Sequence, residues 1–119
     1  MVNEMTTRPI KREEAAVLDR LLGMVPDGKR PDLQGEMLVE EMHDGGMGSL
    51  RFFESGQRRM GRELIAAEYI DEDQVPVSIS VNLDEDGGLF ELDFWKVDFS
   101  PLKRYPRPEE LHEMTRSPS

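Results

Sequence analysis

The residues most able to do chemistry lie in one short stretch, LFELDFWKVDFSPL, at positions 89–102. Glu91, Asp93 and Trp95 alternate along it, so a strand would carry all three side chains on one face, with the two carboxylates about 7 Å apart. Two carboxylates beside an indole could bind a cation or do acid and base chemistry. The same pattern is typical of the solvated face of an amphipathic strand, which is the favoured interpretation because charged side chains lie mostly at the surface.

Three further residues belong to the same candidate site. Lys96 and Asp98 follow within the next few positions, where Lys96 is expected to neutralise its acidic neighbours, and Arg51 comes from an earlier strand-like stretch. In an enzyme, Glu91 or Asp93 would be the base, and Arg51 or Lys96 would stabilise negative charge. No catalytic residue is assigned, because no nucleophile or histidine accompanies these groups, and an enzyme would need them to converge in a partly dry pocket.

An acidic stretch, NLDEDGGLFELD at 82–93, is a second candidate. Asn82, Asp84 and Asp86 stand at alternate positions before a glycine, as the ligands of a calcium loop do. The stretch departs from that pattern at both ends, with Asn at the opening position and Asp93 at the closing one, and strand-like patterns flank it. An acidic hairpin turn is therefore the favoured interpretation, and neither a metal nor a cofactor is predicted.

The remaining motifs favour structural roles. The glycine-rich HDGGMGS at 43–49 lacks the lysine and the helix of a phosphate loop, so a hairpin turn is expected. His43 and His112 lack the close spacing of a metal pair and are expected at the surface. Two basic clusters, RRMGR at 58–62 and KRYPR at 103–107, are expected to pair with the chain's own carboxylates.

The charge balance restricts the partners. Lys and Arg number 15 against 25 Asp and Glu, a formal net charge of -10, which repels nucleic acids and anionic membranes and favours a basic protein partner. The chain has no cysteine, which excludes disulfides and thiolate sites. It also lacks the apolar runs of a signal peptide or a membrane span, so a cytoplasmic location is expected.

A single domain is predicted at residues 7–108, after a flexible arm at 1–6 and before a mostly disordered tail at 109–119 in which 108–114 could form a helix turn. Apolar residues at helical spacing predict a helix from about residue 10 to residue 22, with Thr7 as its cap and Pro9 in its first turn. The period then changes to two, and strands are predicted at 36–43, 49–54, 62–70, 75–83 and 88–97.

These elements predict an α+β fold, with the N-terminal helix packed on an antiparallel sheet of about five strands in two layers. The short links favour a meander, in which Arg51 would lie far from Trp95. Phe90, Leu92 and Phe94 are predicted on the dry face of the last strand, opposite the candidate site.

The order of the motifs resembles an uncharacterised family of small bacterial domains of unknown function. The likeness covers most of residues 10–108, and its most specific part is a closing E-L-D-x-W-K-x-D-x-S-P strand. The resemblance implies the fold and a bacterial setting, and it carries no activity. The positions that match its pattern are Gly48, Ser49, Leu50, Arg51, Phe52, Glu91, Asp93, Trp95, Lys96, Asp98, Ser100 and Pro101.

Several functions follow as hypotheses. The first is a non-catalytic binding domain that uses the polar sheet face around Trp95, because tryptophan is enriched at interface centres; a toxin-neutralising immunity protein is one version of it. The second is a small enzyme that uses Glu91 or Asp93. A domain that binds a metabolite without chemistry is a third, and an edge strand could also pair across a homodimer.

Overall fold

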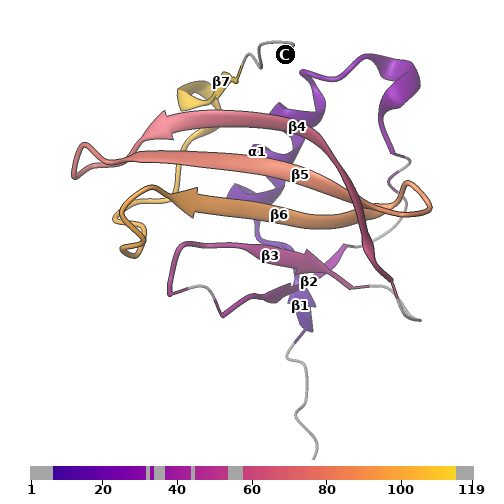
Figure 1. Cartoon of the computed structure of the whole chain (residues 1–119), viewed down its shortest axis with the longest axis horizontal. Helices are drawn as coiled ribbons and strands as arrows, with labels where there is room; N and C mark the ends of the chain where they lie inside the picture. Colours follow the sequence, from indigo (N-terminus) through magenta and orange to yellow (C-terminus); the bar gives the residue numbers. More distant parts are fainter. Residues whose placement is uncertain (1–6, 32, 34–36, 44, 54–57, 115–119) are drawn as a thin grey trace, which may run out of the picture.

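The computed structural model describes residues 7–31, 33, 37–43, 45–53 and 58–114. In these residues the chain forms one α-helix, two short 3-10 turns and a seven-stranded antiparallel sheet (Figure 1). The elements in chain order are β1 (Thr7–Pro9), α1 (Arg12–Leu22), η1 (Asp27–Lys29), β2 (Leu38–Glu41), β3 (Leu50–Phe52), β4 (Met60–Ile70), β5 (Pro76–Asp84), β6 (Leu89–Lys96), η2 (Pro108–Glu110) and β7 (His112–Glu113).

The helix begins slightly later than predicted. Thr7 and Pro9 lie in β1, an edge strand that tolerates proline, rather than at the start of the helix. The N–H of Lys11, which precedes the helix, donates to the carboxylate of Glu14 at 2.8 Å and so satisfies one of the groups left free at a helix start. The buried face of α1 consists of Val17, Leu18, Leu21 and Leu22, at the predicted helical spacing.

The strand order differs from the predicted meander. The sheet runs β1-β2-β3-β6-β5-β4-β7, so β3 pairs with β6 and not with β4. This order extends one apolar row across the core, because Leu50 pairs with Leu92 and Leu92 with Val81. The prediction of about five strands is also wrong. The two additional strands, β1 and β7, have only three and two residues and carry no clear alternation of their own.

One face of the sheet packs against α1 and the other is open (Figure 1). In β5, Val77, Ile79, Val81 and Leu83 are all buried, as their period of two predicts. The alternating residues Ser78 and Ser80 lie on the open face. Helix and sheet together therefore form the expected two-layer α+β domain with a single core between the layers.

A bulge in β6 changes the position of Phe90. The register between β5 and β6 shifts after Asn82, so that Phe90 is an extra residue in β6. Its neighbour Leu89 joins the core cluster in its place. The ring of Phe90 is buried against the guanidinium carbons of Arg51 and Arg58, at 4.9 and 5.4 Å, rather than in the dry layer where alternation predicts it.

The domain continues past the predicted boundary at residue 108. Leu111 is fully buried in the core, and β7 pairs with β4 through Glu68 and His112. Three prolines obscure this segment in the sequence because they interrupt any periodic pattern. The predicted arm at 1–6 and the end of the predicted tail, 115–119, lie outside the described residues.

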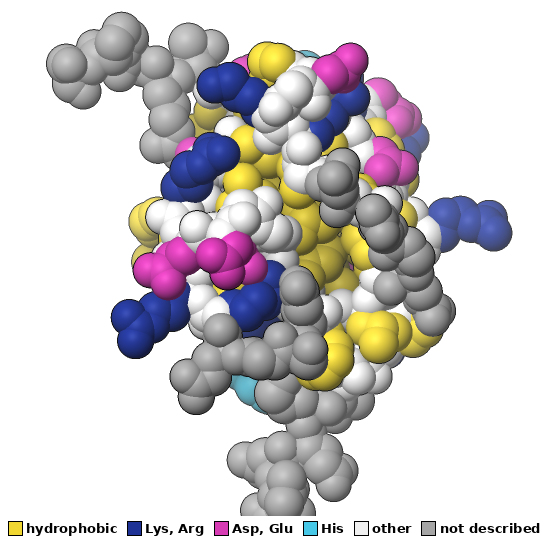
Figure 2. All heavy atoms as spheres, turned by 90° about the vertical axis from the view of Figure 1, so that its right-hand side faces the viewer, with side chains coloured by type: hydrophobic (Ala, Val, Ile, Leu, Met, Phe, Trp, Pro, Cys, Tyr) yellow, Lys and Arg dark blue, Asp and Glu magenta, His cyan; other side chains and the backbone are white. Residues whose placement is uncertain are grey.

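Seen from the right-hand side of Figure 1, hydrophobic side chains form a band through the middle of the molecule, with charged side chains of both signs around it (Figure 2). No helix within the described residues is long and apolar enough to cross a membrane.

Candidate functional site

The strand order places Arg51 beside the predicted site. Arg51 pairs with Glu91 across β3 and β6, and its Nη2 lies 2.7 Å from Glu91 Oε2 on the open face. The strand order, in place of the expected meander, therefore brings Arg51 to Glu91, which lies four residues from Trp95 along β6. Asn82 Nδ2 donates to the other carboxylate oxygen of Glu91 at 3.3 Å. Both oxygens of Glu91 are thus engaged within the sheet.

Asp93 is also held by the fold. Its Oδ1 lies 3.1 Å from Ser49 Oγ, and that buried hydroxyl also accepts the N–H of Phe94 at 2.9 Å. Ser49 therefore ties the start of β3 to the middle of β6. Asp93 thus bonds to Ser49, and Glu91 pairs with Arg51. Both predicted carboxylates therefore stabilise the pairing of β3 with β6.

Trp95 lies on the same face as Asp93, further along β6, where it belongs to a cluster of apolar side chains. Trp95, Val97 and Phe99 are 53%, 56% and 66% exposed, and the rings of Trp95 and Phe99 are 6.1 Å apart. Neighbouring strands continue the cluster, because Ile70 pairs with Pro76 and the N–H of Val97 donates to Pro76 O at 3.1 Å. We call these five residues, Ile70, Pro76, Trp95, Val97 and Phe99, the apolar corner.

The apolar corner lies at the left-hand end of the sheet in Figure 1, where β4 and β6 end and β5 begins. Only Trp95 among its members belongs to the predicted site. Sequence reasoning missed Val97 and Phe99, although they continue the alternation of Trp95 at i+2 and i+4. It missed Ile70 because that residue belongs to a strand that is adjacent only in the folded sheet.

The loop after β6 holds Phe99 in an uncommon backbone conformation. Phe99 has φ 64°, in the left-handed region that bulky residues rarely adopt. Asp98 supports the turn, because its Oδ1 accepts the N–H of Ser100 at 3.0 Å and the hydroxyl of Ser100 at 2.7 Å. These hydrogen bonds hold the pKa of Asp98 below its ordinary value. Asp98 thus shapes the loop that presents Phe99.

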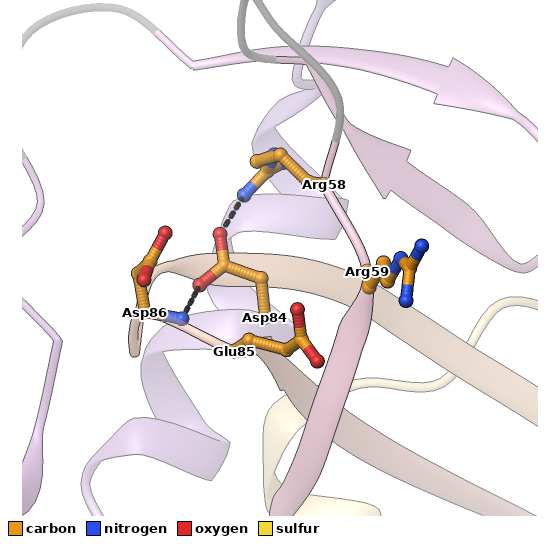
Figure 3. Close-up of a pocket in the computed structure, with 5 residues that line it drawn as sticks. All are labelled: Arg58, Arg59, Asp84, Glu85 and Asp86. Carbon is orange, nitrogen blue, oxygen red and sulfur yellow. Dashed lines mark hydrogen bonds and ion pairs between the residues drawn. The ribbon is translucent and has the colours of Figure 1, made fainter.

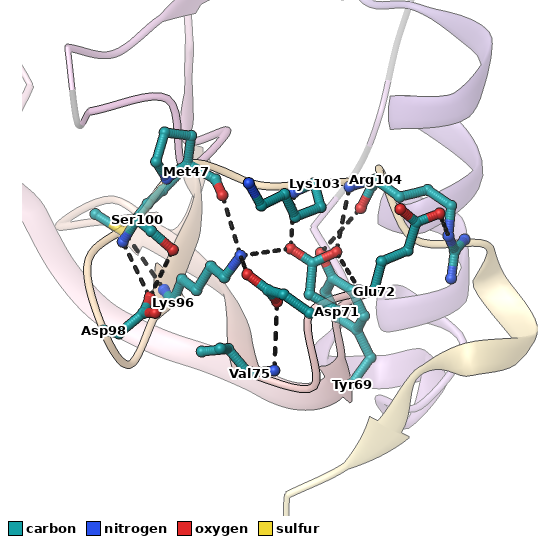
Figure 4. Close-up of polar contacts among 12 residues, drawn as sticks. Met47, Tyr69, Asp71, Glu72, Val75, Lys96, Asp98, Ser100, Lys103 and Arg104 are labelled. Atoms are coloured by element: carbon teal, nitrogen blue, oxygen red, sulfur yellow. Dashed lines mark hydrogen bonds and ion pairs between the residues drawn. The ribbon is translucent and has the colours of Figure 1, made fainter.

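Lys96 is not part of the open face. It is fully buried on the opposite side of β6, where its ammonium group contacts Asp71 Oδ2 at 2.9 Å, Asp73 Oδ2 at 2.7 Å and Pro101 O at 3.0 Å (Figure 4). The expectation that Lys96 neutralises Glu91 and Asp93 at the surface is therefore wrong. The sequence pattern of a strand does not fix which face a charged residue occupies. On the buried face, Asp71, Asp73 and Pro101 accept the three hydrogens of the ammonium group.

Asp71 is the centre of this buried cluster. Its side chain also accepts backbone N–H groups from Glu72, Lys103 and Arg104, at 2.7, 2.8 and 3.2 Å (Figure 4). Burial opposes ionisation, but these hydrogen bonds and Lys96 together hold the pKa of Asp71 below its ordinary value. The cluster fastens the turn between β4 and β5 to the segment that follows β6.

The acidic turn at 82–93 is a hairpin, as predicted. Asp84 Oδ1 accepts the N–H groups of Asp86 and Gly88 at 2.9 and 2.8 Å, and Asp84 Oδ2 pairs with Arg58 at 2.7 Å (Figure 3). Arg58 also donates to the carbonyl oxygens of Phe52 and Leu89. A hollow of about 330 Å³ lies beside this pair. Asp84 therefore stabilises the turn, and the described residues contain no group of three or more side chains suited to a metal ion.

The second basic cluster also pairs internally, as predicted. Arg104 forms two hydrogen bonds with the carboxylate of Glu110, at 2.6 and 3.0 Å, and lies 3.5 Å from Glu72. These contacts attach η2 to the turn after β4. His43 and His112 are both exposed, in agreement with the expectation for them.

The glycine-rich loop packs against the segment after β6. Gly46 O accepts the N–H of Leu102 at 3.1 Å, and Gly48 has φ 105°. A side chain at Gly48 would press on Leu102. A hollow of about 270 Å³ lies between the two segments, lined in part by Glu14 and Tyr105. The buried hydroxyl of Tyr105 has no hydrogen-bond partner among the described residues, and burial raises its pKa, so it stays protonated as a donor.

A cleft of about 480 Å³ opens beside the apolar corner. It is lined by Glu68, Tyr69, Ile70, Pro76, Glu110 and His112, and it shares two residues with the corner. The cleft lies beyond the first residue of β7, His112, where β4 continues to Ile70. Sequence inspection could not reveal it, because its residues come from three segments.

A family model described as a domain of unknown function, DUF6984, matches residues 7–106, most of the chain. This agrees with the resemblance to an uncharacterised domain family that the motifs suggest. No curated protein and no solved structure matches the sequence significantly.

Proposed function

Because the chain belongs to the DUF6984 family, whose function is unknown, no activity comes with membership, and we propose from the geometry that the protein is a non-catalytic interaction module. Its binding surface is the apolar corner on the open face of the sheet, and its partner is another protein with a basic surface. The observation that carries this proposal is the exposure of Trp95, Val97 and Phe99 side by side.

The exposed apolar side chains supply the energy for such an interface. Soluble domains carry single exposed apolar residues without consequence, but a contiguous group of them is typical of a binding surface. Burial of one such side chain contributes about 1.5 to 3 kcal/mol. Tryptophan is among the residues most often found where an interface gains most of its energy. Trp95 lies beside Phe99 on one side and opposite Ser78 of β5 on another.

The conformation of Phe99 supports a role outside the folding of the domain. A left-handed backbone at a bulky residue costs about 1 kcal/mol or more, and glycine or asparagine would avoid that cost. The ring recovers little of it in the free protein, because it is 66% exposed. Strain that presents an exposed aromatic ring is expected where that ring contacts a partner.

The geometry favours binding over catalysis. An enzyme would need Glu91 and Asp93 to converge in a concave and partly dry pocket. Both instead lie on an open sheet face, in hydrogen bonds to Asn82 and Ser49, while Lys96 is buried on the other side. The acid and base chemistry considered from the sequence has no support in this arrangement.

The charge of the chain favours a basic partner over a second copy. With a net charge of -10, two copies facing each other through the same surface would repel. A basic protein would be attracted and guided to the same surface. A toxin neutralised by an immunity protein is one such basic partner.

The proposal is tested by capture followed by a measured affinity. The full-length protein is immobilised and exposed to a cytoplasmic lysate of the source cells, and the proteins it captures are identified, purified and titrated against it. The variants are Trp95→Ala and Phe99→Asn in the apolar corner and Glu91→Gln with Asp93→Asn in the polar part of the face. Met60→Ala is the control, because Met60 is 46% exposed at the other end of β4.

We expect Trp95→Ala and Phe99→Asn each to weaken binding about tenfold or more, a loss of about 1.4 kcal/mol. Met60→Ala and the doubly substituted variant should bind like the wild type. If no captured protein loses affinity in Trp95→Ala, the apolar corner is not the binding surface. If the doubly substituted variant alone loses affinity, the polar part of the face binds instead.

A further inference from the structure

The cleft beside the apolar corner has the features of a pocket for one side chain of the partner. Tyr69, Ile70 and Pro76 line it with apolar surface, and Glu68 and Glu110 bring carboxylates to it. Because Ile70 and Pro76 belong to both the cleft and the apolar corner, a polypeptide that covers the corner would also reach the cleft.

Glu68 is the carboxylate best placed to receive a ligand. It is exposed near the end of β4, opposite His112 of β7. Across the described residues, no hydrogen bond or ion pair engages its carboxylate, in contrast to Glu91, Asp93, Asp84 and Asp71. A carboxylate with this freedom can accept a cation without breaking a contact of the fold.

The other charges around the cleft leave it acidic. Glu110 is ionised at neutral pH, because the hydrogen bonds from Arg104 and Arg107 lower its pKa to about 2. Arg104 contacts both Glu110 and Glu72, so its one positive charge neutralises only one of these two carboxylates. Glu68 adds a further negative charge. It has no cationic partner among the described residues, so the surplus charge is negative.

From these observations we infer that the cleft receives a lysine or arginine side chain of the partner, next to apolar residues of the partner that cover Trp95 and its neighbours. The apolar walls would contact the aliphatic stem of that side chain, and Glu68 would pair with its charged end. This inference rests on the proposed function and names the chemistry of the partner. It predicts a basic residue flanked by aromatic or aliphatic ones.

The test uses a random peptide library displayed on phage and selected against the full-length protein. Selections are run in parallel on the wild type, Trp95→Ala, Glu68→Gln and Glu85→Gln. Glu85 is the matched control, because it is an exposed glutamate in the turn between β5 and β6, at the opposite end of the sheet. The strongest peptide is then synthesised with its lysine or arginine, and again with norleucine at that position.

We expect peptides that need Trp95 and that contain a basic residue next to apolar ones. Glu68→Gln should weaken the basic peptide about three- to fivefold, the range for an ion pair at the edge of an interface. Glu68→Gln should not change the affinity for the norleucine peptide. The effects of Glu68→Gln and of the norleucine replacement on affinity are then not additive. Glu85→Gln should affect neither peptide.

The failures can be told apart. Peptides that need Trp95 but carry no basic residue, or whose basic residue is insensitive to Glu68→Gln, would overturn the assignment of the cleft and leave the apolar corner as a binding surface. If none of the selected peptides depends on Trp95, both the cleft and the apolar corner lose their proposed role. Trp95→Ala must keep the cooperative unfolding of the wild type for either comparison to count.

Discussion

Lys96 illustrates how one residue in a conspicuous motif can serve the fold instead of a reaction. It sits between Trp95 and Asp98, yet its side chain leaves the open face and meets Asp71 and Asp73 in the interior. Three acceptors match the three hydrogens of the ammonium group. The closing stretch of this chain therefore combines an exposed tryptophan with a buried lysine, and the two side chains have different roles.

This assignment predicts that Lys96→Met destabilises the domain. Removal of one partner leaves Asp71 buried without its cation, and breaking a buried pair in this way costs about 3 to 5 kcal/mol. Urea denaturation monitored by Trp95 fluorescence measures the change. Lys103→Met is the control, because the Lys103 side chain is exposed, and it should change the free energy of unfolding by less than about 0.5 kcal/mol. Equal stability of the two variants would contradict a structural role for Lys96.

At the scale of elements, the turn between β5 and β6 depends on a close approach of β4. Gly61 lies at a register shift between β4 and β5, and a β-carbon there would be 2.5 Å from the carbonyl oxygen of Asp84. The backbone of Asp84 cannot move freely, because its side chain is bonded to Arg58 and to the turn. Only glycine fits this position.

Gly61→Ala is therefore expected to destabilise the domain by about 2 kcal/mol, since the strand must shift or lose its pairing. Gly28→Ala is the matched control, because a β-carbon at Gly28 would meet nothing within 4 Å. That variant should be neutral or slightly stabilising. Thermal unfolding of both variants checks the expectation, and a Gly61→Ala melting temperature equal to that of Gly28→Ala would show that the bulge can accommodate a side chain.

For the molecule as a whole, acid stability depends on carboxylates that the fold holds ionised. Hydrogen bonds and ion pairs lower the pKa of Glu14, Asp71, Asp84 and Glu110 despite the burial that opposes ionisation. These groups are spread over the helix, the two turns that flank β5, and η2. A fall in pH therefore weakens several attachments between elements at once.

Glu110 allows the sign of this effect to be tested. Its pKa is about 2 in the folded protein against an ordinary value of 4.5, so the unfolded chain binds more protons in between. The stability that Glu110 contributes is present above pH 4.5 and is lost as the pH falls towards 2. We expect Glu110→Gln to be less stable than the wild type at neutral pH and to lose less stability over this interval.

Urea denaturation at a series of pH values measures how the free energy of unfolding of the wild type and of Glu110→Gln changes with pH. Glu109→Gln is the control, because Glu109 is 68% exposed and lies 3.8 Å from the equally exposed Arg107. It should follow the wild type at every pH. Parallel curves for the wild type and Glu110→Gln would mean that the pair with Arg104 adds no stability.

The sequence by itself determined the elements that repeat a strong local pattern. The helix face, the five longer strands and the acidic hairpin follow from apolar periodicity and turn residues, which act between neighbours in the chain. It also indicated Trp95 as a surface residue of interest and excluded thiolate chemistry, since both depend on composition and alternation. The resemblance to an uncharacterised domain family, also drawn from the sequence, agrees with the family match over residues 7–106.

Only the tertiary structure decided which strands are neighbours and which side chains meet. The pairing of β3 with β6 brings Arg51 to Glu91, the bulge at Phe90 shifts that residue out of the core layer, and the buried acceptors draw Lys96 inside. The apolar corner and its cleft are likewise assembled from segments that are distant in the chain. Alternation along a strand says which residues share a face, but the pairing of strands across the whole domain decides what each face touches.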